Sequence, residues 1–142
     1  MAEPDRRVYY LLQRAAHGLR TAADRRCAAA AGVTVAQLTA LHVIAEEPGC
    51  SQQHVAETLG VREPAVTAMI TRLAAAGLVD KRTHPQEHRA AALHPTPAGE
   101  AAVAAGGPAM AEFNAAVRER LRERLDEVAG ALADLLELSG RL

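Results

Sequence analysis

Three basic residues, Lys81, Arg82 and Arg89, lie close together in the chain, directly after a short segment with few bulky polar side chains. Clustered cations of this kind bind phosphate groups, most often those of a nucleic acid. The 142-residue chain has a formal net charge of -1, so it has no general attraction to DNA or to anionic membranes. Any such attraction has to come from this local cluster.

The segment before the basic cluster, residues 62–75, has the spacing of an amphipathic helix. Its apolar positions recur at i, i+3, i+4 and i+7 and predict a single buried face: Val66, Met69, Ile70 and Leu73. Small side chains on the opposite face would allow close approach to a large partner, and hydroxyl groups there can bind phosphates or base edges. That outward face carries Pro64, Thr67, Ala68, Thr71 and Ala75, flanked by Glu63 and Arg72.

The sequence gives no support for an enzyme. We find no Ser/His/Asp or Cys/His set, no glycine-rich phosphate loop and no paired carboxylates in an apolar setting. Three histidines, His84, His88 and His94, follow the first basic residues, but their spacing matches no common zinc pattern. We therefore expect them to contact phosphate or solvent, and we expect no metal or cofactor.

The two cysteines, Cys27 and Cys50, are too few for a disulfide framework and fit a reducing compartment. Arg25 and Arg26 could lower the pKa of the Cys27 thiol and make it an oxidant sensor. The competing interpretation is a small buried residue, which is also the simplest reading of Cys50. Because no secretion signal and no apolar run of about 18 residues occurs, we expect a cytoplasmic protein.

The remaining segments predict the elements that position this surface. Helices are expected at about 5–30, from Thr34 to the Pro48-Gly49 turn, and from Ser51 to Gly60. Thr34 and Gln37 match a capping box, and Val33 with Leu38 matches a hydrophobic staple. Only 2% of the residues are aromatic, so Ala, Leu and Val must supply the core, which favours helices.

The segment from Leu78 to His94 lacks helical period and predicts a β-hairpin with a loose tip around Pro85. Thr96 and Pro97 then begin a last helical block, in which residues 106–108 (Gly-Gly-Pro) predict a kink or break. The boundary between its final two helices is not defined by the sequence. Two helices joined by a turn and followed by a hairpin make a mostly α, winged helix-turn-helix fold.

The order and spacing of these segments resemble the MarR family of multiple-antibiotic-resistance regulators over nearly the whole chain. In that family the recognition helix ends in Leu-x-x-x-Gly-Leu-Val, the wing carries Asp-x-Arg, and Leu-Thr-x-x-Gly opens the next helix. The first pattern is met by Leu73, Gly77, Leu78 and Val79, and the last by Thr96 and Gly99.

The chain departs from the family pattern at several positions. Glu87 pairs with Arg89 on the wing where Asp is usual, and Pro95 replaces Leu. Arg62 and Ala65 stand where Ser and Thr are common, so the base preference should differ from that of better-known members.

The resemblance implies a homodimer that binds a palindromic DNA operator and represses transcription until a small molecule or an oxidant relieves it. Residues 34–95 would form the DNA-binding lobe of the single domain, and residues 5–32 and 97–142 the helical dimerisation lobe. His17 and His42 are candidate effector-binding residues. The alternative is a helical protein-interaction module without DNA binding. The expected DNA-binding residues are Ser51, Gln52, Arg62, Glu63, Pro64, Thr67, Ala68, Thr71, Arg72, Lys81, Arg82 and Arg89.

Overall fold

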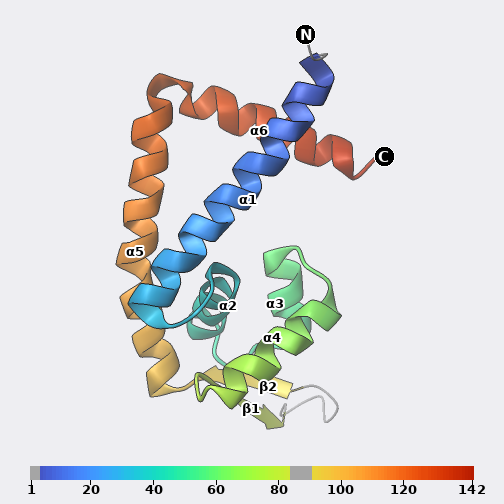
Figure 1. Ribbon diagram of the computed structural model, residues 1–142. Helices are drawn as coiled ribbons and strands as arrows, with labels where there is room; N and C mark the ends of the chain where they lie inside the picture. The colour runs from blue at the N-terminus through green and yellow to red at the C-terminus, as the bar shows by residue number, and fades with distance from the viewer. Residues whose placement is uncertain (1–3, 84–90) are drawn as a thin grey trace. The chain divides into compact units, whose positions relative to one another are not determined.

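The computed structural model describes residues 4–83 and 91–142 (Figure 1). Its elements in chain order are α1 (Pro4–Ala31), α2 (Val35–Glu46), α3 (Gln52–Leu59), α4 (Glu63–Ala75), β1 (Val79–Thr83), β2 (Ala91–Pro95), α5 (Pro97–Leu121), the 3-10 turn η1 (Arg122–Arg124) and α6 (Leu125–Ser139). The mostly helical fold with a two-stranded antiparallel wing confirms the predicted fold class. The chain divides into two compact units, Met1–Met110 and Ala111–Leu142.

The core of the first unit is made almost entirely of aliphatic side chains. Helices α2, α3 and α4 and strand β2 all contribute to it, and α1 adds the side chain of Cys27. Its largest fully buried members are Leu41, Ile44, Ile70, Leu73, Leu93, Val55, Val66 and Cys27. Burial of these side chains provides most of the driving force that holds α2–α4 together.

Local hydrogen bonds define where α2 and α3 begin. The Thr34 side chain accepts a hydrogen bond from Gln37 N, and the Gln37 side chain accepts one from Thr34 N, which completes the predicted capping box. The Ser51 hydroxyl accepts a hydrogen bond from His54 N at 3.1 Å and caps α3. At the other end of α3, Gly60 has φ +66°, a left-handed conformation that glycine adopts without strain.

The wing is a two-stranded hairpin fixed to the turn between α2 and α3. Val79 of β1 pairs with Pro95 of β2, and the register continues to Thr83 opposite Ala91. Leu93 N donates to Cys50 O at 2.9 Å, and Gly49 N donates to Leu93 O at 2.7 Å. The position of β2 is therefore set by the helix-turn-helix itself. Figure 1 shows the hairpin beside α4.

Helix α5 corrects one prediction from the sequence. A kink or a break was expected at residues 106–108, and the break is absent: α5 is one helix from Pro97 to Leu121, with Pro108 inside it. Proline removes one backbone hydrogen bond, which the remaining bonds of so long a helix can tolerate. Gly106 lies directly on α2, where a β-carbon would fall 2.6 Å from Leu38 Cδ1. Gly106 therefore serves close packing between α5 and α2. The helical boundary that the sequence did not define lies at η1.

Large apolar side chains remain exposed in both units. In α1 these are Val8, Tyr9, Tyr10, Leu11 and Leu19, and in α6 they are Leu132, Leu135, Leu136 and Leu138. Helix α6 has no buried residue. Among the described residues, no single helix is long and apolar enough to cross a membrane. Helices α1 and α2 pass such a test only as a pair, bent by 58° at their junction.

Candidate nucleic-acid interface

Helix α4 has one buried face and one exposed face. Val66, Ile70 and Leu73 are buried and Met69 is half-buried, so the helix has the rotation that its sequence predicted. The opposite face is exposed along its whole length. It consists of Glu63, Pro64, Thr67, Ala68, Thr71, Arg72 and Ala75.

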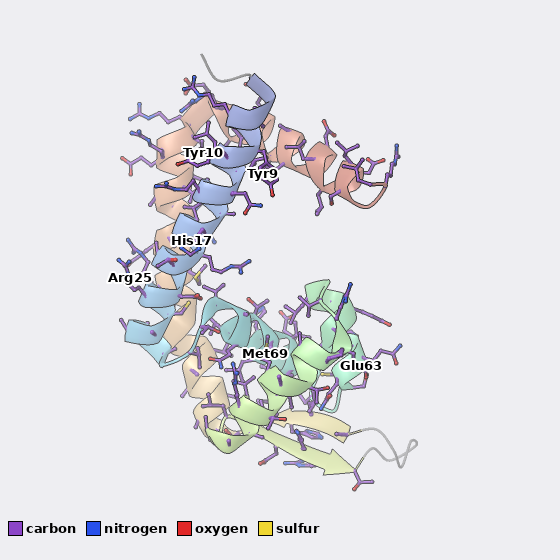
Figure 2. The ribbon with its side chains drawn as sticks, turned by 45° about the vertical axis from the view of Figure 1, so that its right-hand side comes forward. Tyr9, Tyr10, His17, Arg25, Glu63 and Met69 are labelled. Carbon is purple, nitrogen blue, oxygen red and sulfur yellow. The ribbon has the colours of Figure 1, made fainter. Side chains whose placement is uncertain are left out.

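The two ends of α4 differ in charge. Arg62 immediately precedes the helix and makes no side-chain capping bond, and Glu63 lies in the first turn. Figure 2 shows Glu63 on the outer side of the molecule at this end of α4. Arg72 lies in the last turn and is exposed. A negative charge is favourable at a helix N-terminus and a positive one at its C-terminus, so the two residues also stabilise the helix.

The Thr67 hydroxyl links the exposed face of α4 to α3. Thr67 Oγ1 lies 3.0 Å from Gln52 Oε1, at the first position of α3, and 3.1 Å from Glu63 O. Thr71 Oγ1 donates to Thr67 O at 2.8 Å. The structure thus brings together Gln52 and Thr67, which are 15 residues apart in the chain. Ser51 was also predicted to bind DNA, but its hydroxyl already accepts a hydrogen bond as the N-cap of α3.

The wing presents its cations on β1. Asp80, Lys81, Arg82 and Thr83 are all exposed, whereas Ala92 and Leu93 of β2 are buried, Leu93 in the core. Arg82 Nη2 lies 3.8 Å from Asp80 Oδ2, a loose and exposed ion pair that contributes little to stability. Because neither Lys81 nor Arg82 is held in a buried ion pair, both are available to bind a polyanion. Arg89, its expected partner Glu87, and the histidines His84 and His88 lie outside the described residues.

His94 has a different environment from the one expected for a phosphate contact. It is half-buried, and its ring lies about 4 Å from the position that a β-carbon on Gly49 would occupy. Nearby, His54 Nε2 of α3 lies 3.0 Å from Oε2 of Glu47, the residue that ends α2. Across the ranges 4–83 and 91–142, no group of three His, Cys, Asp or Glu side chains could hold a metal ion.

A pocket of about 200 Å³ lies between α2 and the first part of α5. His42, one of the two candidate effector residues, lines it, and its Nε2 lies 3.0 Å from Glu46 Oε1. His17 does not line this pocket and is exposed on α1, where Figure 2 shows it between Tyr9 and Arg25. The other lining residues were not identified from the sequence. They are Leu38, Thr39, Val103, Gly107 and Met110.

The helical spacing of the lining residues was a signal in the sequence that could have indicated this pocket. Leu38 and His42 are four residues apart on α2, and Val103, Gly107 and Met110 follow i, i+4, i+7 on α5, so each set shares one helix face. Which faces meet depends on tertiary packing, and the spacing alone does not give it.

Cys27 is fully buried, and its environment corrects the prediction of an activated thiol. Burial raises the pKa of the Cys27 thiol, and the nearby Asp24 carboxylate raises it further. The expectation that Arg25 and Arg26 would lower this pKa is wrong, because both side chains are exposed on other faces of α1. Burial and Glu47 likewise raise the pKa of the half-buried Cys50. Neither thiol has the electropositive setting of a reactive cysteine.

Comparison with known proteins agrees with this geometry. Residues 31–90 match the model of the MarR family. The chain is 36% identical over 73 residues to a putative transcriptional regulatory protein for the hcr operon of Thauera aromatica. That similarity covers 51% of this chain and 44% of the relative's length, so the chain matches less than half of that protein.

Two solved structures extend the likeness to nearly the whole chain. The transcriptional repressor CouR, bound to a 23-mer DNA duplex, is 27% identical with a TM-score of 0.75, covering 92% of this chain and 90% of that one. PcaV of Streptomyces coelicolor, in complex with its natural ligand, has the same fold at 24% identity and a TM-score of 0.75, covering 99% and 98%. Residues 31–90, which contain the helix-turn-helix and strand β1 of the wing, are therefore similar to the MarR family, and the chain has the winged helix-turn-helix fold of CouR and PcaV.

Proposed function

We propose that this protein is a dimeric, sequence-specific DNA-binding repressor of transcription that a small molecule releases from its operator. The observation that carries the proposal is the exposed, small-residue face of α4 next to the exposed cations of β1. A helix with such a face can enter a major groove, while Lys81 and Arg82 contact the flanking backbone. CouR, which was solved on a DNA duplex, has the same fold.

The exposed apolar side chains support a homodimer. Leu136 is 75% exposed and Tyr9 is 67% exposed in the single chain, and such residues are costly to leave in water. We infer that residues 5–32 and 97–142 form the dimerisation lobe, and that Tyr9, Tyr10 and Phe113 become part of its core. Two-fold symmetry then predicts a palindromic operator with half-sites about one helical turn apart.

The pocket at His42 supports release by a small molecule more than release by an oxidant. Its lining is mostly apolar, with Thr39 and His42 as polar groups that can orient a ligand. Oxidant sensing has less support, because burial keeps the Cys27 thiol protonated. A regulator of this kind performs no catalysis, needs no cofactor and acts in the cytoplasm on its own operator.

A gel-shift assay tests the proposal, using fragments selected from genomic DNA by the purified protein. We expect tight binding to a palindromic fragment, and a strong loss in the double variant Lys81→Ala/Arg82→Ala. The matched control is Arg25→Ala, which removes an exposed cation from α1. If no fragment is enriched and the protein instead retains a protein partner, the chain is an interaction module.

The effector pocket is tested with small, mainly apolar molecules, each screened for its ability to raise the melting temperature. We expect His42→Ala to abolish the response to an active compound and His17→Ala to preserve it. The opposite pattern would place the effector site on α1.

A further inference from the structure

Thr67 has one hydroxyl proton and two acceptors within reach. Its Oγ1 lies 3.0 Å from Gln52 Oε1 and 3.1 Å from Glu63 O. Four other threonines within helices donate to the carbonyl four residues earlier at 2.8–2.9 Å, namely Thr21, Thr39, Thr58 and Thr71. The corresponding contact of Thr67 is longer, and among these five only Thr67 also contacts a side chain on another helix. In this geometry the Thr67 proton can be donated to Gln52 Oε1 on α3 as well as to Glu63 O in its own helix.

The polarity of the Gln52 contact follows from the atoms involved. Gln52 Oε1 is a carbonyl oxygen and can only accept, so a hydrogen bond between it and Thr67 Oγ1 has to use the threonine proton. The amide is then oriented with Oε1 toward α4. Its Nε2 group, which carries two donors, is the end that remains for a partner.

This orientation restricts what Gln52 can recognise. A free glutamine reads adenine with both ends of its amide, since Nε2 donates to N7 and Oε1 accepts from the N6 amino group. One lone pair of Oε1 accepts the Thr67 proton, and this contact holds Oε1 toward α4. In this orientation the amide presents its Nε2 donor end to a base. A donor alone suits any major-groove acceptor, such as N7 of either purine, O6 of guanine or O4 of thymine.

We propose that Thr67 is a positioning residue that orients the Gln52 amide, so that Gln52 donates to a base acceptor and does not make the adenine-specific two-point contact. The proposal rests on the proposed DNA-binding function and deepens it. Base preference at the pair facing Gln52 is thus set by a residue on a different helix.

The test is selection from a library of randomised operators with wild type and the variants Gln52→Ala, Thr67→Val and Thr67→Ser. Loss of preference in Gln52→Ala identifies the base pair that Gln52 reads. Thr67→Val keeps the branched shape but removes the hydroxyl, so it frees Oε1, and we expect adenine at that pair to gain roughly tenfold. Thr67→Ser keeps the hydroxyl and should retain the wild-type preference.

Two controls separate positioning from structure. The Thr67 variants should melt within a few degrees of wild type, because Thr67 is exposed. The melting temperature of Gln52→Ala is measured beside them, because Gln52 is half-buried. The double variant Gln52→Ala/Thr67→Val should match Gln52→Ala alone, since the threonine acts only through Gln52.

The proposal is overturned if Thr67→Val keeps the wild-type preference, if Thr67→Ser shifts it as the valine does, or if Gln52→Ala alters no position. In each of those results the wild type still selects an operator, so the proposed function stands. A wild type that selects no sequence overturns both.

Discussion

The backbone carbonyl of Leu78 lies directly against the α-carbon of Gly99: a β-carbon on residue 99 would fall 2.1 Å from that oxygen. The same carbonyl accepts a hydrogen bond from Thr96 N at 3.2 Å. Thr96 Oγ1 donates to Gly77 O at 2.6 Å and accepts from Gly99 N at 3.0 Å. These contacts join the end of α4, the start of β1 and the start of α5. They give a physical reason for the Thr-x-x-Gly pattern.

Gly99→Ala should destabilise the protein by about 1–3 kcal/mol or more, because the obstructing atom is backbone and cannot rotate away. The control is Gly107→Ala in the same helix, where a β-carbon meets nothing within 4 Å. Alanine there should be neutral or stabilising by up to about 1 kcal/mol. Thermal and denaturant unfolding measure the stability of both variants. Equal stability of the two variants would contradict the close approach at Leu78.

Ser51→Ala should lower stability by about 1 kcal/mol, since it removes the cap of α3. Ser51→Asp should restore most of that loss, because a carboxylate also accepts from the backbone at a helix N-terminus. Operator affinity, measured in parallel, separates the role of Ser51 as a helix cap from a role in DNA binding. A loss of DNA affinity in Ser51→Ala without any loss of stability would indicate a direct DNA contact instead of a cap.

Arg72→Ala should weaken binding to all operator sequences by a similar factor, as expected for a phosphate contact from an exposed cation. The slope of log affinity against log salt should fall by about 1 for each contact that is lost. For the wild-type dimer, neutralising about 6–10 phosphates predicts a loss of roughly 10³–10⁵ in affinity between 50 and 200 mM salt. Sequence-dependent losses in Arg72→Ala would show that it reads bases.

Stability should fall at alkaline pH because of Cys27. Its folded-state pKa is raised above the ordinary value of 9.0, mainly by burial, so its contribution is fully present below that pH. It is lost as pH rises through the folded-state pKa. Denaturant unfolding between pH 7 and 11 should show this decline. Cys27→Ala should make it shallower than in the matched variant Cys50→Ala, whose thiol is only half-buried. Identical slopes would refute the assignment to Cys27.

Several features of the fold were predictable because their causes are local. The capping box at Thr34 and Gln37 and the Ser51 cap span four residues each, and Gly60 ends α3 through its own backbone freedom. The buried face of α4 follows from side-chain spacing on a helix of fixed pitch. Such patterns can be read in a sequence without knowing what the helix packs against.

Other features depend on which surfaces meet. The sequence by itself determined the helices of the first unit, the hairpin, and the face of α4 that is exposed, because hydrogen bonds and periodicity within a few residues specify them. Only the tertiary structure decided that Gln52 meets Thr67, that Cys27 is buried beside Asp24, and that α5 continues past Pro108 with Gly106 on Leu38. These relationships join residues distant in the chain or oppose a local propensity, and packing energy, which no short window of sequence contains, selects among the alternatives.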